Sequence, residues 1–243
     1  MSGRSPAAAG EAWRTGTIVA LVPMRHHSER VPEKNYREMA GQPLYAHILN
    51  VLQGCPELDR IVVDTDSPVI RKGITQRFPK IQILERPPEL RGDNVPMNEI
   101  LVYDASQVPA DLYLQTHSTN PLLRPETISR ALHALRSSRE HDSLFSVTRL
   151  QERLWTAGGD AVNHDPELLV RTQDLPATYL ENSCLYLVGR EVLLARKNRI
   201  GRHPLLFPID PAEAWDIDEE LDMQIAECLL QARSRPASPP AET

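Results

Sequence analysis

The sequence has 243 residues, of which 41% are hydrophobic and 25% are charged, and its net charge is -6. This length and composition fit one large globular α/β domain, or one domain with a small appendage. The negative charge argues against bulk attraction to nucleic acid or to an anionic membrane. An aromatic content of 5% also argues against a base-stacking surface for single-stranded nucleic acids.

The cysteines and the first residues predict a cytoplasmic location. Cys55, Cys184 and Cys228 are widely spaced and show neither metal-ligand nor redox spacing. An odd number of free thiols fits a reducing compartment. The first sixteen residues are small and polar and the apolar run after them is short, so no secretory signal and no membrane span are expected.

Apolar runs alternate with helical patterns along most of the chain. Strands are expected at 18–23, 60–64, 81–85, 112–116, 143–147, 183–188 and 205–209. Helices are expected at 43–52, 68–78, 97–106, 125–135, 190–198 and 219–230. This alternation predicts an α/β fold with a mostly parallel sheet and helices on both faces. We expect one domain at 17–230, with a disordered leader at 1–16 and a disordered tail at 231–243.

The segment 149–176 interrupts the alternation. It is polar, contains Gly158 and Gly159, and lacks a clean period. It is too long for a structureless loop inside a compact domain. We therefore expect an excursion at about 149–180, in the form of a hairpin that contacts another subunit.

The loop after the first predicted strand carries three cations. Residues 25–35 read RHHSERVPEKN and include Arg25, Arg30 and Lys34. A cationic loop beyond the carboxyl end of a strand is where open α/β sheets bind phosphates. The loop lacks the glycines of a Walker A motif, so side chains would hold the anion. The alternative is a solvated charged face.

Two aspartates precede the last predicted helix. Asp216 and Asp218 lie two residues apart, so in extended backbone their side chains point to the same side. Two carboxylates form a minimal site for Mg²⁺, which otherwise keeps waters and binds phosphate oxygens. The alternative is that Asp218 caps the helix that begins near Glu219.

Polar residues also follow the strand predicted at 112–116. Gln115 could contact a base or a substrate hydroxyl, and His117 is a candidate general base. The alternative is a strand-end turn that caps the next helix. Weaker candidates for anion or hydroxyl contacts lie at 86–93 and 171–183.

Taken together, these motifs resemble the cytidylyltransferase family of the CMP-N-acylneuraminate synthetases and, more distantly, the CMP-Kdo synthetases. Residues 25–35 look like the family's Arg-x-x-Ser-Lys-x-x-Pro-x-Lys-Asn. Other matches lie at 40–44, 63–66, 114–122 and 216–218, the last with the family's Asp-Ile-Asp metal motif. The likeness covers about 17–230.

The resemblance implies a Rossmann-like nucleotide-diphospho-sugar transferase fold that uses CTP and Mg²⁺. It implies that Asp216 and Asp218 hold the metal. For the nucleotide it implies a site built from Arg25, Ser28, Arg30, Lys34, Asn35 and Arg86. For the acceptor, a small acid, the candidates are Gln115, His117, Arg153, Arg171 and Tyr179. The family is typically dimeric, and Arg153 and Arg171 would then meet the acceptor in the partner's site.

The implied reaction is attack by an acceptor oxygen on the α-phosphorus of CTP, with release of pyrophosphate. Arg25, Lys34, Asp216 and Asp218 are the expected catalytic residues. The leading acceptor is a nonulosonic, sialic-type sugar acid. Two departures keep alternatives open. Glu29 replaces a family lysine, which allows a non-catalytic nucleotide-binding relative. Leu180 replaces a frequent arginine, which allows an organophosphonate or another sugar acid as the acceptor.

Overall fold

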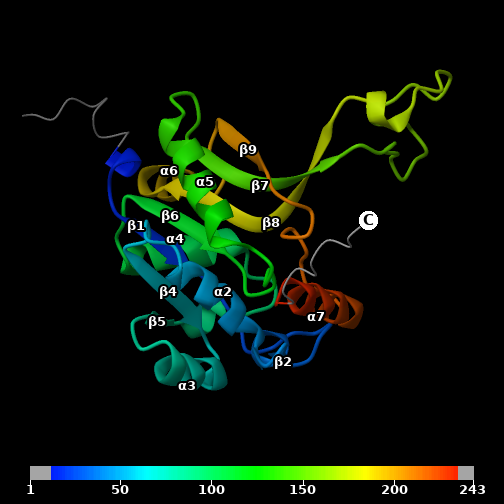
Figure 1. Ribbon diagram of the computed structural model, residues 1–243. Coiled ribbons are helices and arrows are strands. Elements are labelled where there is room, and N and C mark those ends of the chain that lie inside the picture. The colour runs from blue at the N-terminus through cyan, green and yellow to red at the C-terminus, as the bar shows by residue number, and fades with distance from the viewer. Residues whose placement is uncertain (1–11, 235–243) are drawn as a thin grey trace, which may run out of the picture.

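The computed structural model describes residues 12–234 and contains a seven-stranded sheet in the order β5-β4-β1-β6-β8-β7-β9 (Figure 1). The strands are β1 (Ile18–Leu21), β4 (Arg60–Thr65), β5 (Gln82–Glu85), β6 (Leu112–Thr116), β7 (Ser143–Leu150), β8 (Thr178–Gly189) and β9 (Pro204–Pro208). Among these seven, only β8 runs antiparallel to its neighbours. The expected α/β fold with a mostly parallel sheet is confirmed.

Helices cover both faces of the sheet. They are α2 (Leu44–Gln53), α3 (Pro68–Arg77), α4 (Met97–Gln107), α5 (Pro125–Ser137), α6 (Arg190–Arg196) and α7 (Glu220–Ser234). One core cluster joins Ile18 and Ala20 of β1 to α2, α3 and α5, and a second joins Val19 and Leu21 to α4 and α6. Because successive side chains of β1 point to opposite faces of the sheet, the strand contributes to both hydrophobic layers.

Short elements complete the described part of the chain. They are the strand pair β2 (Glu38–Met39) and β3 (Gln42–Pro43) and the 3₁₀ helices η1 (Ala12–Arg14), η2 (Lys34–Tyr36), η3 (Pro88–Leu90) and η4 (Thr172–Asp174). All the helices and strands expected from the sequence are present, and all but β6 have at least one shifted end. Within residues 12–234, no helix is both long and apolar enough to cross a bilayer.

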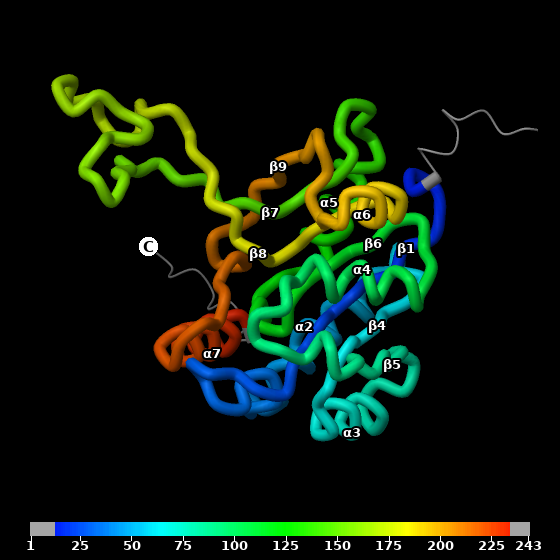
Figure 2. Tube along the Cα trace, turned by 180° about the vertical axis from the view of Figure 1, so that it is seen from behind, coloured from blue at the N-terminus to red at the C-terminus, as the bar shows by residue number. Residues whose placement is uncertain are grey.

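The predicted excursion is a projecting arm. Strands β7 and β8 pair as far as Leu150 and Thr178, and their register shifts between Phe145 and Val147. A register shift of this kind increases strand twist, which carries the two strand ends away from the sheet. Residues 151–177, which we call the arm, extend from these ends beyond the body of the protein (Figures 1 and 2).

Two predicted boundaries are wrong. The leader was expected to run to residue 16, but η1 packs on the body, and Trp13 is buried against the core. Burial of this large aromatic side chain outweighs the local preference for disorder. The tail was expected from residue 231, but α7 continues to Ser234. The remaining residues of the predicted leader and tail, 1–11 and 235–243, lie outside the described residues.

Candidate active site

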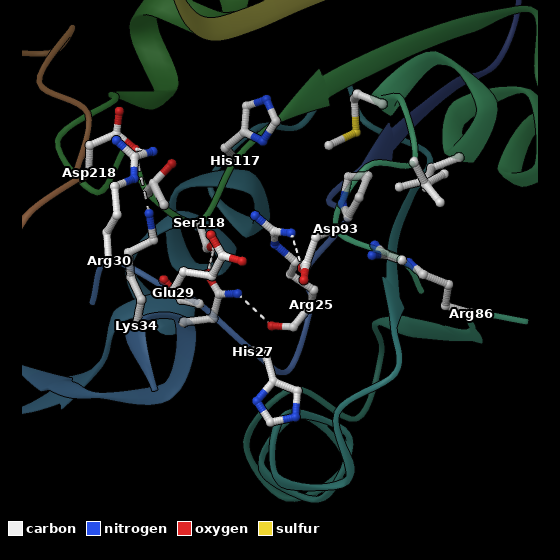
Figure 3. Close-up of a pocket in the computed structure, with 18 residues that line it drawn as sticks. Arg25, His27, Glu29, Arg30, Lys34, Arg86, Asp93, His117, Ser118 and Asp218 are labelled. Atoms are coloured by element: carbon white, nitrogen blue, oxygen red, sulfur yellow. Dashed lines mark hydrogen bonds and ion pairs between the residues drawn. The ribbon is translucent and has the colours of Figure 1, made fainter. Parts of the chain in front are cut away.

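A pocket of about 470 Å³ lies beyond the carboxyl ends of β1, β5 and β6 (Figure 3). It is lined by the loop after β1, the loop between β5 and α4, the first turn of α4, the loop after β6, and the turn before α7. Of the predicted site residues, the lining includes Arg25, Ser28, Arg30, Lys34, Asn35, Arg86, His117 and Asp218. This edge is where open α/β sheets bind their ligands.

The loop after β1 is held in place by backbone and side-chain hydrogen bonds. The N–H of Met24 donates to Asp64 O at 2.8 Å, which continues the pairing of β1 with β4. The buried Asn35 then donates from Nδ2 to Arg25 O and accepts from Ser118 Oγ, both at 2.7 Å. Asn35 therefore links both ends of the loop to the segment after β6, and its amide holds this side of the pocket in place.

The cations of this loop meet the acidic turn before α7. Arg30 Nη2 lies 2.6 Å from Asp218 Oδ1, and Lys34 Nζ lies 3.7 Å from the same oxygen. Lys34 Nζ also donates to Ile217 O at 2.7 Å. Burial lowers the pKa of Lys34, and the nearby Asp218 opposes this shift. Motifs separated by more than 180 residues thus form one site.

Apolar packing brings the two motifs together. Val31 in the loop and Ile217 in the turn are both fully buried. They share a hydrophobic cluster with Leu44, Leu122 and Met223. Asp218 lines the pocket. Asp216 does not line it, but it interacts electrostatically with Asp218 and with Lys34.

The two aspartates fit a divalent cation. Burial raises the pKa of Asp216, a hydrogen bond from Thr119 opposes the shift, and the charge of Asp218 adds to it. Nearby, the buried Asn120 Oδ1 has no hydrogen-bond partner, while Asn120 Nδ2 lies 3.5 Å from Asp216 Oδ1. Carboxylate and amide oxygens are ligands that Mg²⁺ accepts.

Within the part of the chain that the structure describes, no group of three or more His, Cys, Asp or Glu residues forms a metal cluster. A metal on Asp216 and Asp218 would therefore take further oxygens from water or a ligand. Among the described residues the Asp218 carboxylate contacts Arg30 and Lys34, which does not support the alternative assignment of Asp218 as a helix cap. Asp222, in the first turn of α7, accepts with Oδ2 from the N–H groups of Asp218 and Glu219 at 3.0 and 2.8 Å.

Arg86 lines the pocket and also forms a buried ion pair. Its Nε donates to Asp64 Oδ1, and both side chains are almost fully buried. Asp104 of α4 lies beside Asp64, and burial together with the charge of Asp64 raises the pKa of Asp104 to about 9. The raised pKa favours the protonated form of Asp104, which could then donate to Asp64. Arg86 is thus held by the buried Asp64, and the second buried carboxyl group, that of Asp104, lies beside this pair.

Gln115 differs from the sequence prediction, and His117 lies beside it. Gln115 is buried behind the pocket and does not line it. Its Oε1 accepts from Arg199 Nη1 at 2.7 Å, and its Nε2 lies 2.9 Å from His117 Nε2. Burial, together with the charges of Arg199 and Lys34, lowers the pKa of His117 to about 3. This shift favours the neutral form of His117, and the general-base role suggested by the sequence stays a prediction.

The arm residues do not reach the pocket of their own chain. The side chain of Arg153 donates to Val170 O, and Arg171 pairs with Asp174 at 2.7 Å. Tyr179 is exposed on β8. None of the three lines the pocket.

Sequence reasoning missed several residues that shape the site. They are Asp64, Asp104, Tyr186 and Arg199. Asp93, which pairs with Arg25 at 2.8 Å, belongs to the weaker candidate segment 86–93. Asp64 belongs to a matched motif, but its pairing with Arg86 has no local signal. Arg199 lies in the turn after α6, where an arginine resembles any solvated cation.

A loop-rich edge of a parallel sheet, three cations and two aspartates together define an α/β protein of the nucleotidyltransferase type. A family model described as cytidylyltransferase matches residues 19–234. The chain therefore belongs to the cytidylyltransferase family of nucleotidyltransferases, as the motifs indicated.

Two curated relatives illustrate the likeness. N-acylneuraminate cytidylyltransferase A of Danio rerio is 26% identical over 218 residues, which cover 86% of this chain and 50% of the relative. This chain thus spans about half the length of that protein. CMP-N,N'-diacetyllegionaminic acid synthase of Legionella pneumophila is 27% identical over 230 residues, covering 88% of this chain and 96% of the relative.

A solved structure confirms the fold. The structure of CMP:2-keto-3-deoxy-manno-octonic acid synthetase complexed with CTP aligns with a TM-score of 0.67 and 15% sequence identity. The alignment covers 89% of this chain and 99% of the solved one. At this identity the likeness supports the shared α/β architecture alone.

Proposed function

We propose that this protein is a CTP-dependent cytidylyltransferase that converts an acidic acceptor, a nonulosonic sugar acid, to its CMP derivative and releases pyrophosphate. The observation that carries the proposal is the meeting of Arg30, Lys34 and Asp218 at one pocket, with Asp216 beside them. Such a set of charges suits a metal-bound triphosphate better than a simple anion. Membership in the cytidylyltransferase family supports CTP as the nucleotide.

The cations act mainly on the leaving group. Transfer of a nucleotidyl group needs alignment and cancellation of charge more than covalent help from the protein. Arg25, Arg30 and Lys34 surround the loop side of the pocket and stabilise the negative charge that develops on pyrophosphate. Ser28 lies on the same side as a hydrogen-bond donor. When bound on Asp216 and Asp218, Mg²⁺ supplies further neutralisation of phosphate charge.

We extend the proposal to a homodimer. The arm exposes a set of large apolar side chains, namely Trp155, Val162, Leu168 and Leu169. Leu169 is 90% exposed, and clusters of this kind mark interaction surfaces. In a dimer, Arg153 and Arg171 on one arm would approach the acceptor in the partner's pocket. Replacement of Leu169 with Asp would then give a monomer in analytical ultracentrifugation, whereas a variant that stays dimeric would contradict this interface. The cytoplasmic location stays a prediction.

The activity is tested by pyrophosphate release with Mg²⁺ and each nucleoside triphosphate in turn. The acceptor panel contains N-acetylneuraminate, N,N'-diacetyllegionaminate, 3-deoxy-manno-octulosonate and 2-aminoethylphosphonate. We expect release with CTP and at least one sugar acid. Release only with the phosphonate would move the assignment to that acceptor class. CTP binding by calorimetry without release from any acid would favour a non-catalytic nucleotide-binding protein, which is the alternative that Glu29 in the pocket wall raises.

A further inference from the structure

Behind the pocket lies a chain of three polar side chains that the function proposed above does not explain. Arg199 Nη1 donates to Gln115 Oε1 at 2.7 Å, and Gln115 Nε2 lies 2.9 Å from His117 Nε2. Gln115 is 1% exposed, whereas His117 lines the pocket. We call these three residues the Arg199–Gln115–His117 relay.

Hydrogen-bond chemistry fixes the direction of each contact. A guanidinium group can only donate, so the atom of Gln115 that faces Arg199 must be the amide oxygen. The amide nitrogen of Gln115 therefore faces His117, and it also donates to Thr116 O at 3.2 Å. An amide N–H can only donate to the imidazole, so His117 Nε2 must accept. The ring proton of a neutral His117 is thereby placed on Nδ1.

Arg199 is itself firmly positioned. Its guanidinium carbon lies 3.6 Å from the ring centroid of Tyr186, and Nη2 donates to Tyr186 Oη at 2.8 Å. Glu181 lies 3.7 Å from Nη2 and accepts a hydrogen bond from Tyr186 Oη. The backbone N–H of Arg199 donates to Asn98 Oδ1 at 3.0 Å. Because several contacts hold the guanidinium, it can orient the Gln115 amide without reorganising.

We infer that Arg199 is a positioning residue that acts through Gln115 to present His117 to the pocket as a neutral hydrogen-bond donor at Nδ1, directed at an anionic oxygen of the acceptor. In Figure 3, one ring nitrogen of His117 faces the other labelled side chains and the other faces away from them. Since Nε2 contacts the buried Gln115, the inward nitrogen is Nδ1. An acceptor carboxylate or phosphonate oxygen is a suitable partner for this N–H.

The first experiment measures the tautomer directly, with CTP and acceptor both absent. Long-range ¹H–¹⁵N NMR distinguishes a protonated Nδ1 from a protonated Nε2, and a His117→Gln variant assigns the signal. We expect the Nδ1–H form in the wild-type protein at pH 7. The isosteric Gln115→Glu substitution replaces the N–H donor with an acceptor, and we expect Nε2 of His117 to become protonated. An Nε2–H tautomer in the wild-type protein would overturn the inference.

The second experiment separates positioning from a purely structural role. This step rests on the proposed function and uses CTP with whichever acid from the panel gives turnover. We expect Arg199→Met and Gln115→Glu to raise the KM for that acid at least about tenfold, as loss of one charge-assisted hydrogen bond implies. The KM for CTP should stay within about twofold. Arg196→Met, an exposed arginine at the end of α6, is the matched control and should behave as wild type.

The outcomes distinguish the two proposals. Normal acceptor KM values in both variants, with the tautomer changed, would contradict the positioning role. Absence of turnover in the wild-type protein with every acid would remove the proposed function, and the NMR measurement would still decide the relay. If Arg199→Met fails to fold, as seen by circular dichroism, the isosteric Gln115→Glu variant carries both readouts.

Discussion

The pocket has two walls that differ in how their charges are held. The charged wall consists of the loop after β1 with the residues that its cations contact. Its two arginine ion pairs are open to solvent, whereas Lys34 is only 13% exposed. Arg25 and Asp93 are 46% and 58% exposed, and Arg30 and Asp218 are 59% and 46% exposed. The buried wall consists of His117, which lines the pocket, with Gln115, Arg199 and Tyr186 behind it, and there the side chain of Arg199 is only 16% exposed.

The difference indicates which contacts a ligand can replace. Exposed ion pairs contribute only about 0–1 kcal/mol to stability, so a triphosphate can take over the cations and a metal can take over Asp218 at small cost. A buried hydrogen-bonded network is costly to disrupt and has one stable arrangement. The charged wall is therefore exchangeable, and, under the proposed function, the buried wall would hold the acceptor in one fixed arrangement.

Loss of the metal-site carboxylate tests the charged wall most severely. We expect Asp218→Ala to lower kcat at least about 100-fold, because transition-state charge is left without its compensating cation. The unfolding free energy should change by less than about 1 kcal/mol, because the ion pair with Arg30 is exposed. Pyrophosphate release and urea unfolding measure the two effects.

Glu220→Ala provides the control for Asp218→Ala. Glu220 lies two residues further along and pairs with Arg37 at 2.5 Å, and it does not line the pocket. The Glu220→Ala variant should retain activity within about twofold of the wild-type protein. Full activity of Asp218→Ala would remove the metal role. Loss of folding in that variant would show that the charged wall is structural and not exchangeable.

A smaller effect is expected at Glu29, which lines the charged wall with the wrong charge for a triphosphate. Glu29→Lys should lower the KM for CTP about 3–10-fold in low salt, and the gain should shrink in about 0.5 M salt as screening increases. Glu33→Lys makes the same charge change in the same loop outside the pocket lining and is the matched control. Equal gains in both variants would indicate a general charge effect.

The sequence predicted the charged wall. Of the buried wall it singled out Gln115 and His117 but missed Arg199 and Tyr186, for physical reasons. Strands and helices follow hydrophobic periodicity, which is a local property, so these elements were found. Arg30 and Asp218 belong to motifs whose order along the chain matches that of the family, so the sequence could identify them. Arg199, by contrast, gains its role from Gln115, 84 residues away, and nothing near Arg199 signals that contact.

The error at the amino end has the same cause. Trp13 follows a run of small residues that favours disorder. Its burial depends on Gly189 at the end of β8, where the Cβ of any larger residue would come within 2.9 Å of the indole ring. Only the folded sheet brings this glycine and Trp13 together. Long-range packing thus decides what a local pattern leaves open.

Arg86, like Lys34, departs from the exposed ion pairs of the charged wall, because its partner Asp64 and the neighbouring Asp104 are buried. Burial and the charge of Asp64 raise the pKa of Asp104 to about 9, from an ordinary value of 3.8. Above about pH 4 the unfolded chain releases this proton while the folded protein keeps it. The resulting stability contribution is complete below the unfolded pKa and is lost progressively as the pH rises towards about 9.

Asp104→Asn should remove this dependence, because the amide N–H can donate to Asp64 at every pH. We expect the variant to exceed the wild-type protein in unfolding free energy by about 1–3 kcal/mol at pH 8.5, and to match it near pH 4. Urea unfolding at the two pH values measures the difference, and Asp160→Asn, an exposed position in the arm, should follow the wild-type protein. If the wild-type and Asp104→Asn proteins lose stability in parallel, Asp104 does not hold the proton. The ion pair between Arg86 and Asp64 would then be as replaceable by a ligand as the exposed ion pairs of the charged wall.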